Sequence, residues 1–387
     1  MNADPSETPP PDRVGALSGF RVVDLTQVVS GPFATRILAD QGADVIKVEP
    51  PGGDIVRWMA GENGLSPTFV VINRNKRSVV LDLKQQRDRD LLDRLIATAD
   101  VVAQNFRPGT AERLGFGPER LLERHPRLVY ASISGYGTQG PYAGQLVDDP
   151  IIQGLSGLTS IQGGLRGRPR LVRIIVPDKV TALTAAQAIT AALLARERTG
   201  RGQHVEVSML DAVLSFLWPE GMAYHTLLDL AREPVDRRDL VYETRDGHII
   251  VSTVAHREFE GFCRAAGVEE WLADPRFQDA AGLVAHAAER LERMAAVIAT
   301  RTSADWLAAL RAEDVPCGPV LRREELHEHP QIVANQIVHE SLHPRAGRLR
   351  QTRPPERLHD TPSSLRLTAP LLGQHTDEVL AELGLAG

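Results

Sequence analysis

The chain has 387 residues, of which 42% are hydrophobic and 24% are charged, a balance typical of a soluble globular protein. Its formal net charge of −6 argues against a nucleic-acid-binding surface as the main function, and no apolar run approaches the roughly 20 residues that a membrane span requires. Because single hydrophobic cores stop growing at roughly 250–300 residues, we expect two domains.

The cysteines and the N-terminal stretch indicate the compartment. The two cysteines, Cys263 and Cys317, lie far apart and in no metal or redox spacing, which favours a reducing cytoplasm without disulfides. The His-Glu-His string at 327–329 lacks the H-E-x-x-H spacing of a zinc site, so we expect no metal. Residues 1–15 are acidic and rich in proline, and we expect a disordered lead-in rather than a signal peptide.

Strand and helix patterns alternate along the first half of the chain. A short buried strand at 21–25 is followed by the loop TQVVSGP, a helix at 32–41 and a strand at 44–49. The pattern continues with strands at 78–83, 100–106, 128–134 and 203–209 and helices at 86–99, 109–114 and 117–125. This alternation predicts an α/β fold with a Rossmann-like open parallel sheet that carries helices on both faces.

The glycines do not follow the pattern of a nicotinamide-cofactor site. The first strand-to-helix turn, TQVVSGP, lacks the glycine spacing that lets a backbone approach a pyrophosphate, and no Walker A string occurs. A G-x-G-x-x-G string at 135–140 is followed by Pro141 and Tyr142, so no helix N-terminus is offered to a phosphate. We interpret this string as a glycine-rich active-site loop.

Asp178 stands at the head of a helix dense in Ala and Leu at 180–198, with Gly200 as its stop. Apolar residues fall on nearly every side of this helix, so we expect it to be buried all round. Asp is a preferred N-cap residue, so one interpretation of Asp178 is an ordinary cap. The other interpretation is an ionised carboxylate that is directed into a cleft and serves as a nucleophile.

The composition changes near residue 231, where a charged, linker-like stretch begins. Beyond it we expect a strand pair joined by a turn at Asp246-Gly247, and then helices rich in Ala, Leu and Arg. These define a small α+β domain at 231–321, after a large domain at 16–230. The tail at 322–387 is too poor in apolar residues to fold alone, so we expect it to pack back on the large domain and to end in a helix.

Six strings along the chain form a recognisable set. They are GPFATRILADQGADVIKVEPPGGD, NRNKRSVVLDLK, NFRPGTAERLGFG, SGYGTQGPYAG, ARERTGRGQHVEVSMLDA and APLLGQHTDEVLAELG. Together they resemble the family III CoA-transferases, which include formyl-CoA and carnitine CoA-transferases and share their fold with the α-methylacyl-CoA racemases. The resemblance covers the chain after residue 15. It implies a large Rossmann-like domain built from both chain ends, a smaller domain between them, and an interlocked homodimer.

The resemblance also implies roles for single residues. It makes Asp178 the catalytic nucleophile, although many members have Gly-Asp where this chain has Pro177-Asp178, and it assigns Gly135, Tyr136 and Gly137 to the substrate loop. Lys84, Arg107 and Arg113 are cations that suit phosphates. A phosphate-binding arginine of some members is replaced by Pro50-Pro51, and a lysine by Leu146. The CoA-binding residues that it implies are Val29, Ser30, Leu81, Asp82, Leu83, Lys84, Asn105, Phe106, Arg107, Arg113, Leu146, Val147, Asp148 and Asp149.

The reaction implied is transfer of coenzyme A between an acyl-CoA donor and a carboxylic acid acceptor, through an aspartyl anhydride and an aspartyl-CoA thioester. Coenzyme A enters as a substrate, and no tightly bound cofactor is expected. Catalysis must come mainly from orientation, exclusion of water and donors that face the oxyanion. The Gly135–Gly140 loop and backbone N–H groups near Asp178 are the candidates for those donors. The sequence does not specify the donor or the acceptor.

Two alternatives stay open. The first is an acyl-CoA racemase, which needs two acid/base groups on opposite sides of a carbon atom. The racemases have a histidine before the loop aspartate, whereas this chain has Asp148-Asp149, which can also be a solvated turn. The second is a CoA-binding relative without turnover.

Overall fold

The computed structural model describes residues 15–61, 64–164, 167–229 and 239–385. It divides into two compact units, of which the larger comprises Met1–Pro234 with Gln336–Gly387 and the smaller Val235–Asn335. Residues 322–335, predicted to belong to the tail, therefore fall within the smaller unit. The predicted lead-in at 1–15, except Gly15, and the predicted boundary at 231 lie outside the described residues.

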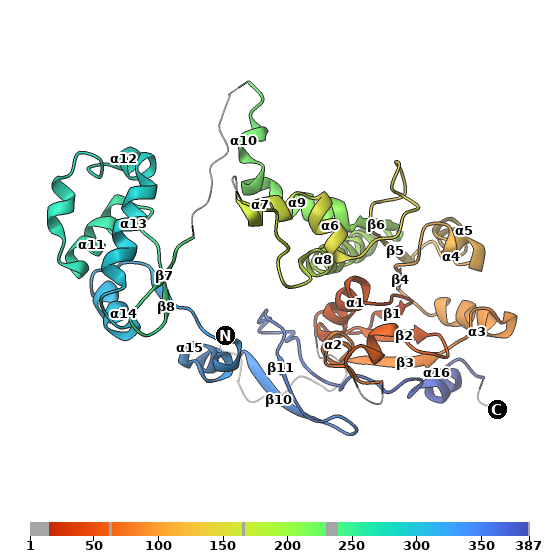
Figure 1. Ribbon diagram of the computed structural model, residues 1–387. Coiled ribbons are helices and arrows are strands. Elements are labelled where there is room, and N and C mark those ends of the chain that lie inside the picture. The colour runs from red at the N-terminus through yellow and green to blue at the C-terminus, as the bar shows by residue number, and fades with distance from the viewer. Residues whose placement is uncertain (1–14, 62–63, 165–166, 230–238, 386–387) are drawn as a thin grey trace, which may run out of the picture. The chain divides into compact units, whose positions relative to one another are not determined.

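A six-stranded parallel sheet forms the centre of the large unit (Figure 1). Its strands lie in the order β3-β2-β1-β4-β5-β6, which is the order of dinucleotide-binding Rossmann folds. Each neighbouring pair is parallel, so the predicted α/β fold class is confirmed. The strands are β1 (Arg21–Asp24), β2 (Asp44–Glu49), β3 (Lys76–Val80), β4 (Val101–Gln104), β5 (Val129–Ser134) and β6 (His204–Ser208).

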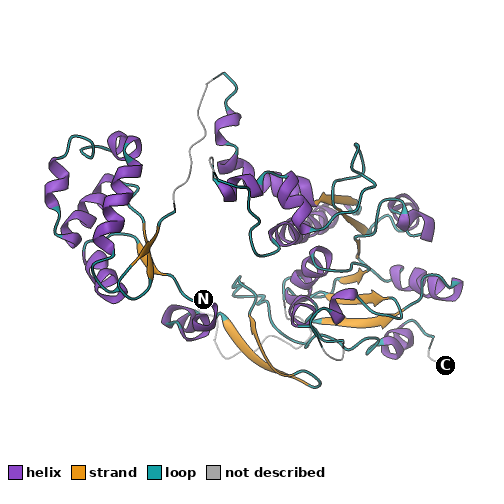
Figure 2. Cartoon of the chain, viewed as in Figure 1, coloured by secondary structure: helices purple, strands orange, loops and turns teal. Residues whose placement is uncertain are grey.

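Helices cover both faces of this sheet (Figure 2). On one face, α1 (Ser30–Asp40) and α8 (Val176–Thr199) bury Leu38 and Ile189 against sheet residues such as Val22. On the other face, α3 (Gln86–Ile96), α5 (Pro118–Arg124) and α16 (Thr376–Glu382) pack on neighbours such as Val23. Because both faces are covered, central strands such as β4 carry consecutive buried apolar residues, Val101–Ala103, rather than an alternating pattern.

The remaining helices of the large unit are short, apart from α9, which follows β6. They include one, at residues 149–155, that packs on α8 and bonds to its N-terminal end. They are η1 (Ile55–Trp58), α2 (Pro67–Ile72), α4 (Thr110–Leu114), α6 (Asp149–Leu155), α7 (Leu158–Gly163), α9 (Met209–Gly221) and α10 (Ala223–Thr226).

Helix α8 differs from its prediction in extent and in burial. It begins four residues before the predicted start, at Val176, and ends at Thr199, where Gly200 with φ of 74° is its C-cap. It is not buried all round within this chain. Leu183 and Leu194 are 57% and 56% exposed and lie along one stripe of the helix, so the even spread of apolar residues reflects a face that this unit leaves uncovered.

The C-terminal tail packs on the large unit. A hairpin of β10 (Val338–His343) and β11 (Gly347–Thr352) precedes it, and α16 then lies against β3, an edge strand of the sheet. The His375 N–H donates to the Ser78 carbonyl at 2.9 Å, and the Arg77 guanidinium pairs with Glu382 at 2.6 Å. The tail thus supplies partners to an edge that would otherwise present unpaired backbone groups.

The small unit has its own core beneath a three-stranded antiparallel sheet. Trp306, Phe259, Phe262 and Phe277 are fully buried in that core. Its strands are β7 (Val241–Glu243), β8 (His248–Val251) and β9 (Cys317–Pro319). Its helices are α11 (His256–Ala266), η2 (Glu269–Ala273), α12 (Ala280–Ala285), α13 (Ala287–Ile298), α14 (Ser303–Ala312), η3 (Arg323–Glu328) and α15 (Pro330–Ala334).

Among the described residues, no helix combines the length and apolar character needed to cross a membrane. The same residues hold no group of three or more His, Cys, Asp or Glu side chains arranged to bind a metal ion.

Candidate active site

A cavity of about 480 Å³ lies at the carboxyl ends of β1, β4 and β5. Residues that directly follow these strands line it, namely Gln27 and Val28 after β1, Asn105 after β4, and Gly135 after β5. Strands β1 and β4 are neighbours, and the strand order reverses between them. Ligands of open α/β sheets bind at this kind of switch point, and Asp178 lines the same cavity.

Asp178 reaches the cavity from the first turn of α8. The N-cap of this helix is Ile175, so the interpretation of Asp178 as an ordinary cap is wrong, and Asp178 is the third helical residue. Pro177 occupies one of the first two helical positions, where its fixed φ suits the helix and its missing N–H costs no bond. A carboxylate here lies at the positive end of the helix dipole.

The pKa of the Asp178 carboxyl is raised to about 6. Burial is the largest cause, and the negative charge of Asp149 is the next. Hydrogen bonds from the hydroxyl and the backbone N–H of Ser30 act in the opposite direction and stabilise the ionised form. At neutral pH the group is therefore mostly ionised, and it is a stronger base than an ordinary carboxylate with a pKa near 3.9.

Two residues of α6 hold the start of α8. Asp149 is buried, and its Oδ2 accepts the Asp178 backbone N–H at 3.1 Å, so a side chain from another helix satisfies one free amide of α8. Its Oδ1 accepts Gln153 Nε2 at 2.7 Å, and Gln153 Oε1 accepts the Val172 N–H at 2.9 Å. Burial raises the pKa of Asp149 as well. The neighbouring Asp148 is exposed.

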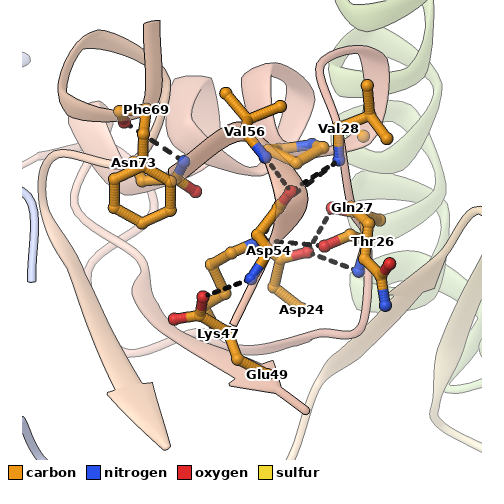
Figure 3. A network of polar contacts seen from close by, with 12 residues as sticks. Asp24, Thr26, Gln27, Val28, Lys47, Glu49, Asp54, Val56, Phe69 and Asn73 are labelled. Carbon is orange, nitrogen blue, oxygen red and sulfur yellow. Dashed lines mark hydrogen bonds and ion pairs between the residues drawn. The ribbon is translucent and has the colours of Figure 1, made fainter. Parts of the chain in front are cut away.

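The turn after β1 carries a strained residue. Val28 has φ of 68°, a left-handed conformation that is unfavourable for a β-branched side chain and costs roughly 1–3 kcal/mol. Its N–H donates to both carboxylate oxygens of Asp54, each at 3.2 Å (Figure 3). Gln27 is fixed by a reciprocal pair of bonds, its N–H to Asn105 Oδ1 at 2.8 Å and its carbonyl from Asn105 Nδ2 at 2.7 Å.

Buried charges lie beneath this turn (Figure 3). Lys47 Nζ is 3.0 Å from Asp54 and donates to the Thr26 carbonyl at 2.8 Å, and the Lys47 and Asp54 side chains are both fully buried. Glu49 accepts the Asp54 N–H at 3.1 Å and pairs with Arg57 at 2.6 Å. Such groups are tolerated inside a protein only when paired and hydrogen-bonded, as they are here.

A second, smaller cavity of about 250 Å³ adjoins the first. Gln27 and Phe106 line both cavities. The wall of the smaller one is mainly apolar, with Glu49, Asp82 and Lys84 as charged residues. Its apolar residues are Leu25, Val48, Pro50, Leu81, Leu83, Phe106 and Leu114.

The structure brings most of the predicted site residues together. Phe106 lines both cavities, and the buried Val29 is the N-cap of α1 just before Ser30. Those that line the smaller cavity are Leu81, Asp82, Leu83, Lys84 and Phe106. Those that line the larger cavity are Ser30, Asn105, Phe106, Arg107, Gly135, Tyr136, Leu146, Val147, Asp148, Asp149 and Asp178.

Three predicted residues, Val29, Arg113 and Gly137, are absent from both of these linings. Arg113 is exposed on α4 and donates to Thr110 Oγ1 at 2.8 Å. The Gly137 N–H donates to Ser134 Oγ at 3.1 Å, just as the Asp178 N–H donates to Asp149. These two backbone donors are therefore already engaged, which argues against them as donors to a substrate oxyanion.

Sequence reasoning missed several residues of the cavity wall, among them Gln27, Val28, Gln145 and Met209. Gln27 and Val28 belong to the TQVVSGP loop, and their place after a strand of a parallel sheet was a usable signal. It also missed Asp54, because a lone Asp after two glycines is most often part of a solvated turn.

Comparison with known proteins identifies the family. The family model described as CoA-transferase family III matches residues 17–376. The chain belongs to CoA-transferase family III. The resemblance carried by the six sequence strings is confirmed, and the protein is an enzyme of the CoA-transferase class.

Relatives of this CoA-transferase match it over nearly its whole length. An acyl-CoA transferase of Fusarium pseudograminearum is 37% identical and covers 96% of this chain and 85% of its own. A succinate–glutarate CoA-transferase of Agrobacterium fabrum is 35% identical and covers 96% and 97%. The crystal structure of a CAIB/BAIF family protein from Brucella suis is 31% identical, with a TM-score of 0.84 over 96% of this chain and all of that one.

Proposed function

We propose that this CoA-transferase moves coenzyme A between a small acyl-CoA and a carboxylic acid through covalent intermediates on Asp178. One observation carries the proposal: a half-buried carboxylate at the head of a long helix lines a cavity at the switch point of the sheet, with two donors from Ser30 on it. A group in this position is held, largely ionised and accessible to a thioester.

The first half of the reaction removes coenzyme A from the donor. A carboxylate oxygen of Asp178 attacks the thioester carbonyl carbon, the C–S bond breaks, and CoA thiolate leaves behind an aspartyl mixed anhydride. The thiolate then attacks the aspartyl carbonyl carbon, the bond to the bridging oxygen breaks, and the donor acid departs as a carboxylate. The product is an aspartyl-CoA thioester.

The second half repeats these steps in reverse. The acceptor carboxylate attacks the aspartyl thioester, which expels CoA thiolate and forms a new anhydride. The thiolate attacks the acyl carbon of the acceptor, and Asp178 leaves as a free carboxylate. No proton is consumed, so the site needs no strong general acid, and the raised pKa of Asp178 serves nucleophilicity.

The two adjoining cavities suit an extended ligand such as CoA. The smaller, apolar cavity around Leu81 and Leu114 matches a planar adenine ring, and the larger cavity holds the reacting end beside Asp178. Lys84 and Arg107 line these cavities, where they offer positive charge to the phosphates. We retain Arg113, exposed on α4, as a phosphate ligand at the outer end of this path.

The structure supports the racemase alternative less well. A racemase needs a second acid/base group free to take a proton. Asp149, a buried carboxylate beside Asp178, accepts the Asp178 N–H with one oxygen and the Gln153 amide with the other. A CoA-binding protein without turnover would need no carboxylate held in this way.

The test is covalent trapping on Asp178. Succinyl-CoA with glutarate is the first pair to try, from the name of the Agrobacterium relative, followed by other short acyl-CoA donors and acids. We expect hydroxylamine to convert the adduct to a hydroxamate on the peptide that holds Asp178. Asp178→Asn should bind CoA and lose transfer by at least about a thousandfold, since the nucleophile is gone. Near-full transfer in Asp178→Asn, or an adduct on another carboxylate, would refute the proposal.

We further propose that two copies of the chain form the interlocked homodimer implied by the family. The support is an apolar surface that the large unit leaves exposed. Light scattering should give twice the chain mass of 42.3 kDa at micromolar concentration, and a folded monomer would refute this. The exposed residues are Ile151 and Leu155 of α6, Ile161 of α7, Leu183 and Leu194 of α8, and Phe216 and Trp218 of α9.

The location that we propose is the cytoplasm. Cys263 and Cys317 are both free thiols, a state that a reducing compartment maintains. Cell fractionation followed by immunoblotting tests this, and recovery with an oxidising compartment would contradict it.

A further inference from the structure

We propose that Asp54 is a positioning residue for the reaction: its carboxylate holds the backbone of Val28 and thereby directs Ser30 at Asp178. This inference rests on the proposed function and adds a residue that neither contacts the nucleophile nor lines the cavity itself. Asp54 is fully buried, lies just before η1 and faces the backbone of Val28 (Figure 3).

The first step of the argument is that the turn after β1 is held at every residue. The Thr26 N–H donates to Asp24 at 3.0 Å, and the Thr26 carbonyl accepts from Lys47 at 2.8 Å. Both backbone groups of Gln27 are bonded to Asn105. The Val28 N–H donates to Asp54. Three of these four partners come from other strands or loops, so the turn is fixed by the sheet rather than by its own geometry.

The second step is that Val28 needs this support. With φ of 68°, it adopts a backbone conformation that Gly enters freely but a β-branched residue rarely adopts. Such a conformation persists only where surrounding contacts over-determine it. The bond from the Val28 N–H to an ionised carboxylate is the contact that acts on this residue directly, and bonds to charged acceptors are the stronger kind.

The third step connects Val28 to the nucleophile. Helix α1 begins at Ser30, two residues after Val28, so the direction in which the turn ends sets where the first residue of α1 lies. Ser30 and Asp178 line the same cavity, and the Ser30 hydroxyl and N–H lie where they act as donors that lower the pKa of the Asp178 carboxyl. If Val28 relaxed to a common conformation, the chain would leave the turn in another direction, and these two donors would move off Asp178.

Lys47 supports both Asp54 and the start of the turn. It pairs with Asp54 at 3.0 Å and donates to the Thr26 carbonyl, so it joins the carboxylate to the other end of the same turn. Burial alone would disfavour its charged form, but Asp24, Asp54 and Glu49 around it raise its pKa. Asp54 also accepts the Val56 N–H at 3.1 Å, as the cap of η1, and this ordinary structural role must be separated from positioning by experiment.

The experiment compares Asp54→Asn with the wild-type enzyme in two measurements. Carbon NMR of side-chain-labelled aspartate, with the Asp178 signal assigned through Asp178→Asn, follows the titration of Asp178 without any substrate. Steady-state transfer gives kcat, and calorimetry gives the affinity for CoA. Asn at position 54 offers one oxygen in place of two and no charge, so the Val28 amide loses its partner or shares it.

We expect Asp178 in Asp54→Asn to titrate at higher pH, because the Ser30 donors that stabilise its ionised form are displaced. The charges around it, Asp148 and Asp149 on α6 and Lys179 on its own helix, are unchanged in the variant. The acid limb of the plot of kcat against pH should move to higher pH, together with the titration of Asp178. We expect kcat to fall about tenfold or more, with CoA affinity within about twofold of wild type.

Asp40→Asn is the matched control. Asp40 is also buried in the large unit and pairs with Arg74 at 2.8 Å, but it lies at the last residue of α1 and makes no contact with the turn. The Asp40→Asn substitution also removes one buried negative charge, so it should lower the melting temperature about as much as Asp54→Asn does. Its Asp178 titration, acid limb and kcat should stay as in the wild type.

A double variant keeps the test decisive if Asp54→Asn does not fold. Lys47→Met with Asp54→Leu removes both charges and leaves no lone buried charge, which proteins often tolerate better than a broken pair. It also deletes the acceptor for Val28, so the same rise in Asp178 titration and fall in kcat are expected.

An unchanged Asp178 titration and kcat in both Asp54 variants would overturn the inference, as would an equal change in Asp40→Asn. Its failure differs from failure of the proposed function. If the titration rises as expected while Asp178→Asn still transfers CoA, the positioning contact stands and the proposed nucleophile is wrong. If Asp178→Asn is inactive and the Asp54 variants behave as wild type, only the positioning role is refuted.

Discussion

Two loops line the cavity beside Asp178, and they are held in opposite ways. The turn after β1 is fixed by bonds to distant partners, among them Lys47, Asp54 and Asn105. The loop after β5 is held mainly by bonds to itself. The Gly137 N–H donates to Ser134, the Ala143 N–H to the Gly140 carbonyl, and the Gln145 N–H to the Tyr142 carbonyl. Residues 138–146 of this loop are exposed apart from Ala143, which is half-buried.

The difference shows how this site divides its tasks. The fixed turn presents Ser30 to Asp178, the proposed nucleophile, and a displacement there of even an ångström would misplace the reacting groups. The second loop has few long-range bonds, so we expect it to open at a smaller free-energy cost and to adapt to different acyl groups. Substitutions in the fixed turn should therefore change kcat, whereas those in the exposed loop should change KM or nothing.

Ser30→Ala should have the largest effect in this comparison. It removes one of the two donors that stabilise ionised Asp178, so the pKa of Asp178 should rise from about 6. Transfer requires the ionised form, so activity should be lost at higher pH than in the wild type as the pH falls. A hydrogen bond to a charged group is worth about 1.5–3 kcal/mol, which corresponds to a loss in kcat of about 10- to 100-fold.

The measurement is kcat from pH 5 to 9 together with CoA binding, which Ser30→Ala should leave nearly unchanged. Ser30→Thr keeps a hydroxyl and serves as the control, and it should recover part of the rate. A profile for Ser30→Ala that superimposes on the wild type would remove the donor role of Ser30 and with it the contrast between the two loops.

Much of the fixed side was predictable from the sequence. The strands of the sheet, the helices around it and the position of Asp178 near the start of α8 follow from apolar runs, proline and glycine signals and Ala-rich composition. The resemblance assigned Asp178 as nucleophile and Ser30 to the site. What the sequence could not show was the direction of side chains after the turn. That direction depends on Val28, which has a positive φ although it is not a glycine, so its residue type gives no signal of this conformation.

Buried charges account for the other omission. Charged residues are usually exposed, so the residue types of Lys47 in the strand DVIKVE and of Asp54 after two glycines give no sign that both are buried. Both are fully buried because β2 lies inside a sheet covered on both faces, and each is the partner that makes the other tolerable. The burial of such a pair depends on the strands and helices that cover it, which no local pattern encodes.

Gly135→Ala tests where the fixed strand β5 becomes the exposed loop. A Cβ at this position would lie 2.1 Å from Val147 Cγ1, so the two loop ends must separate. We expect a loss of stability of about 1–3 kcal/mol, as for overpacking, and a several-fold rise in KM for the acyl-CoA. Gly144→Ala is the control, since nothing lies within 4 Å of its Cβ position, and it should match the wild type. Equal kinetics in the two variants would show that the close approach of Val147 is not needed.

Asp149→Asn should have a smaller and opposite effect to Ser30→Ala. The amide can still accept the Asp178 N–H, but the negative charge that helps raise the pKa of Asp178 is gone. Burial, the larger cause of the raised pKa, remains, so the pKa of Asp178 should fall below about 6 without returning to its ordinary value. The acid limb of kcat should move to lower pH, with kcat at pH 8 within about threefold of wild type. Movement to higher pH would mean that Asp149 acts chiefly through the helix start rather than through its charge.

Asp148→Ala should have the smallest effect, although Asp148 is the sequence neighbour of Asp149 and lines the same cavity. Asp148 is exposed and is the N-cap of α6 without a side-chain cap bond, so its removal breaks no bond of the cap. Its charge adds to the pKa of Asp178 less than that of Asp149 does. We expect an unchanged melting temperature, kcat within about twofold, and an acid limb that moves slightly to lower pH. Transfer assayed with the true substrate pair decides the matter, because a loss of tenfold or more would place Asp148 in contact with the acyl group and make the exposed loop part of the chemistry.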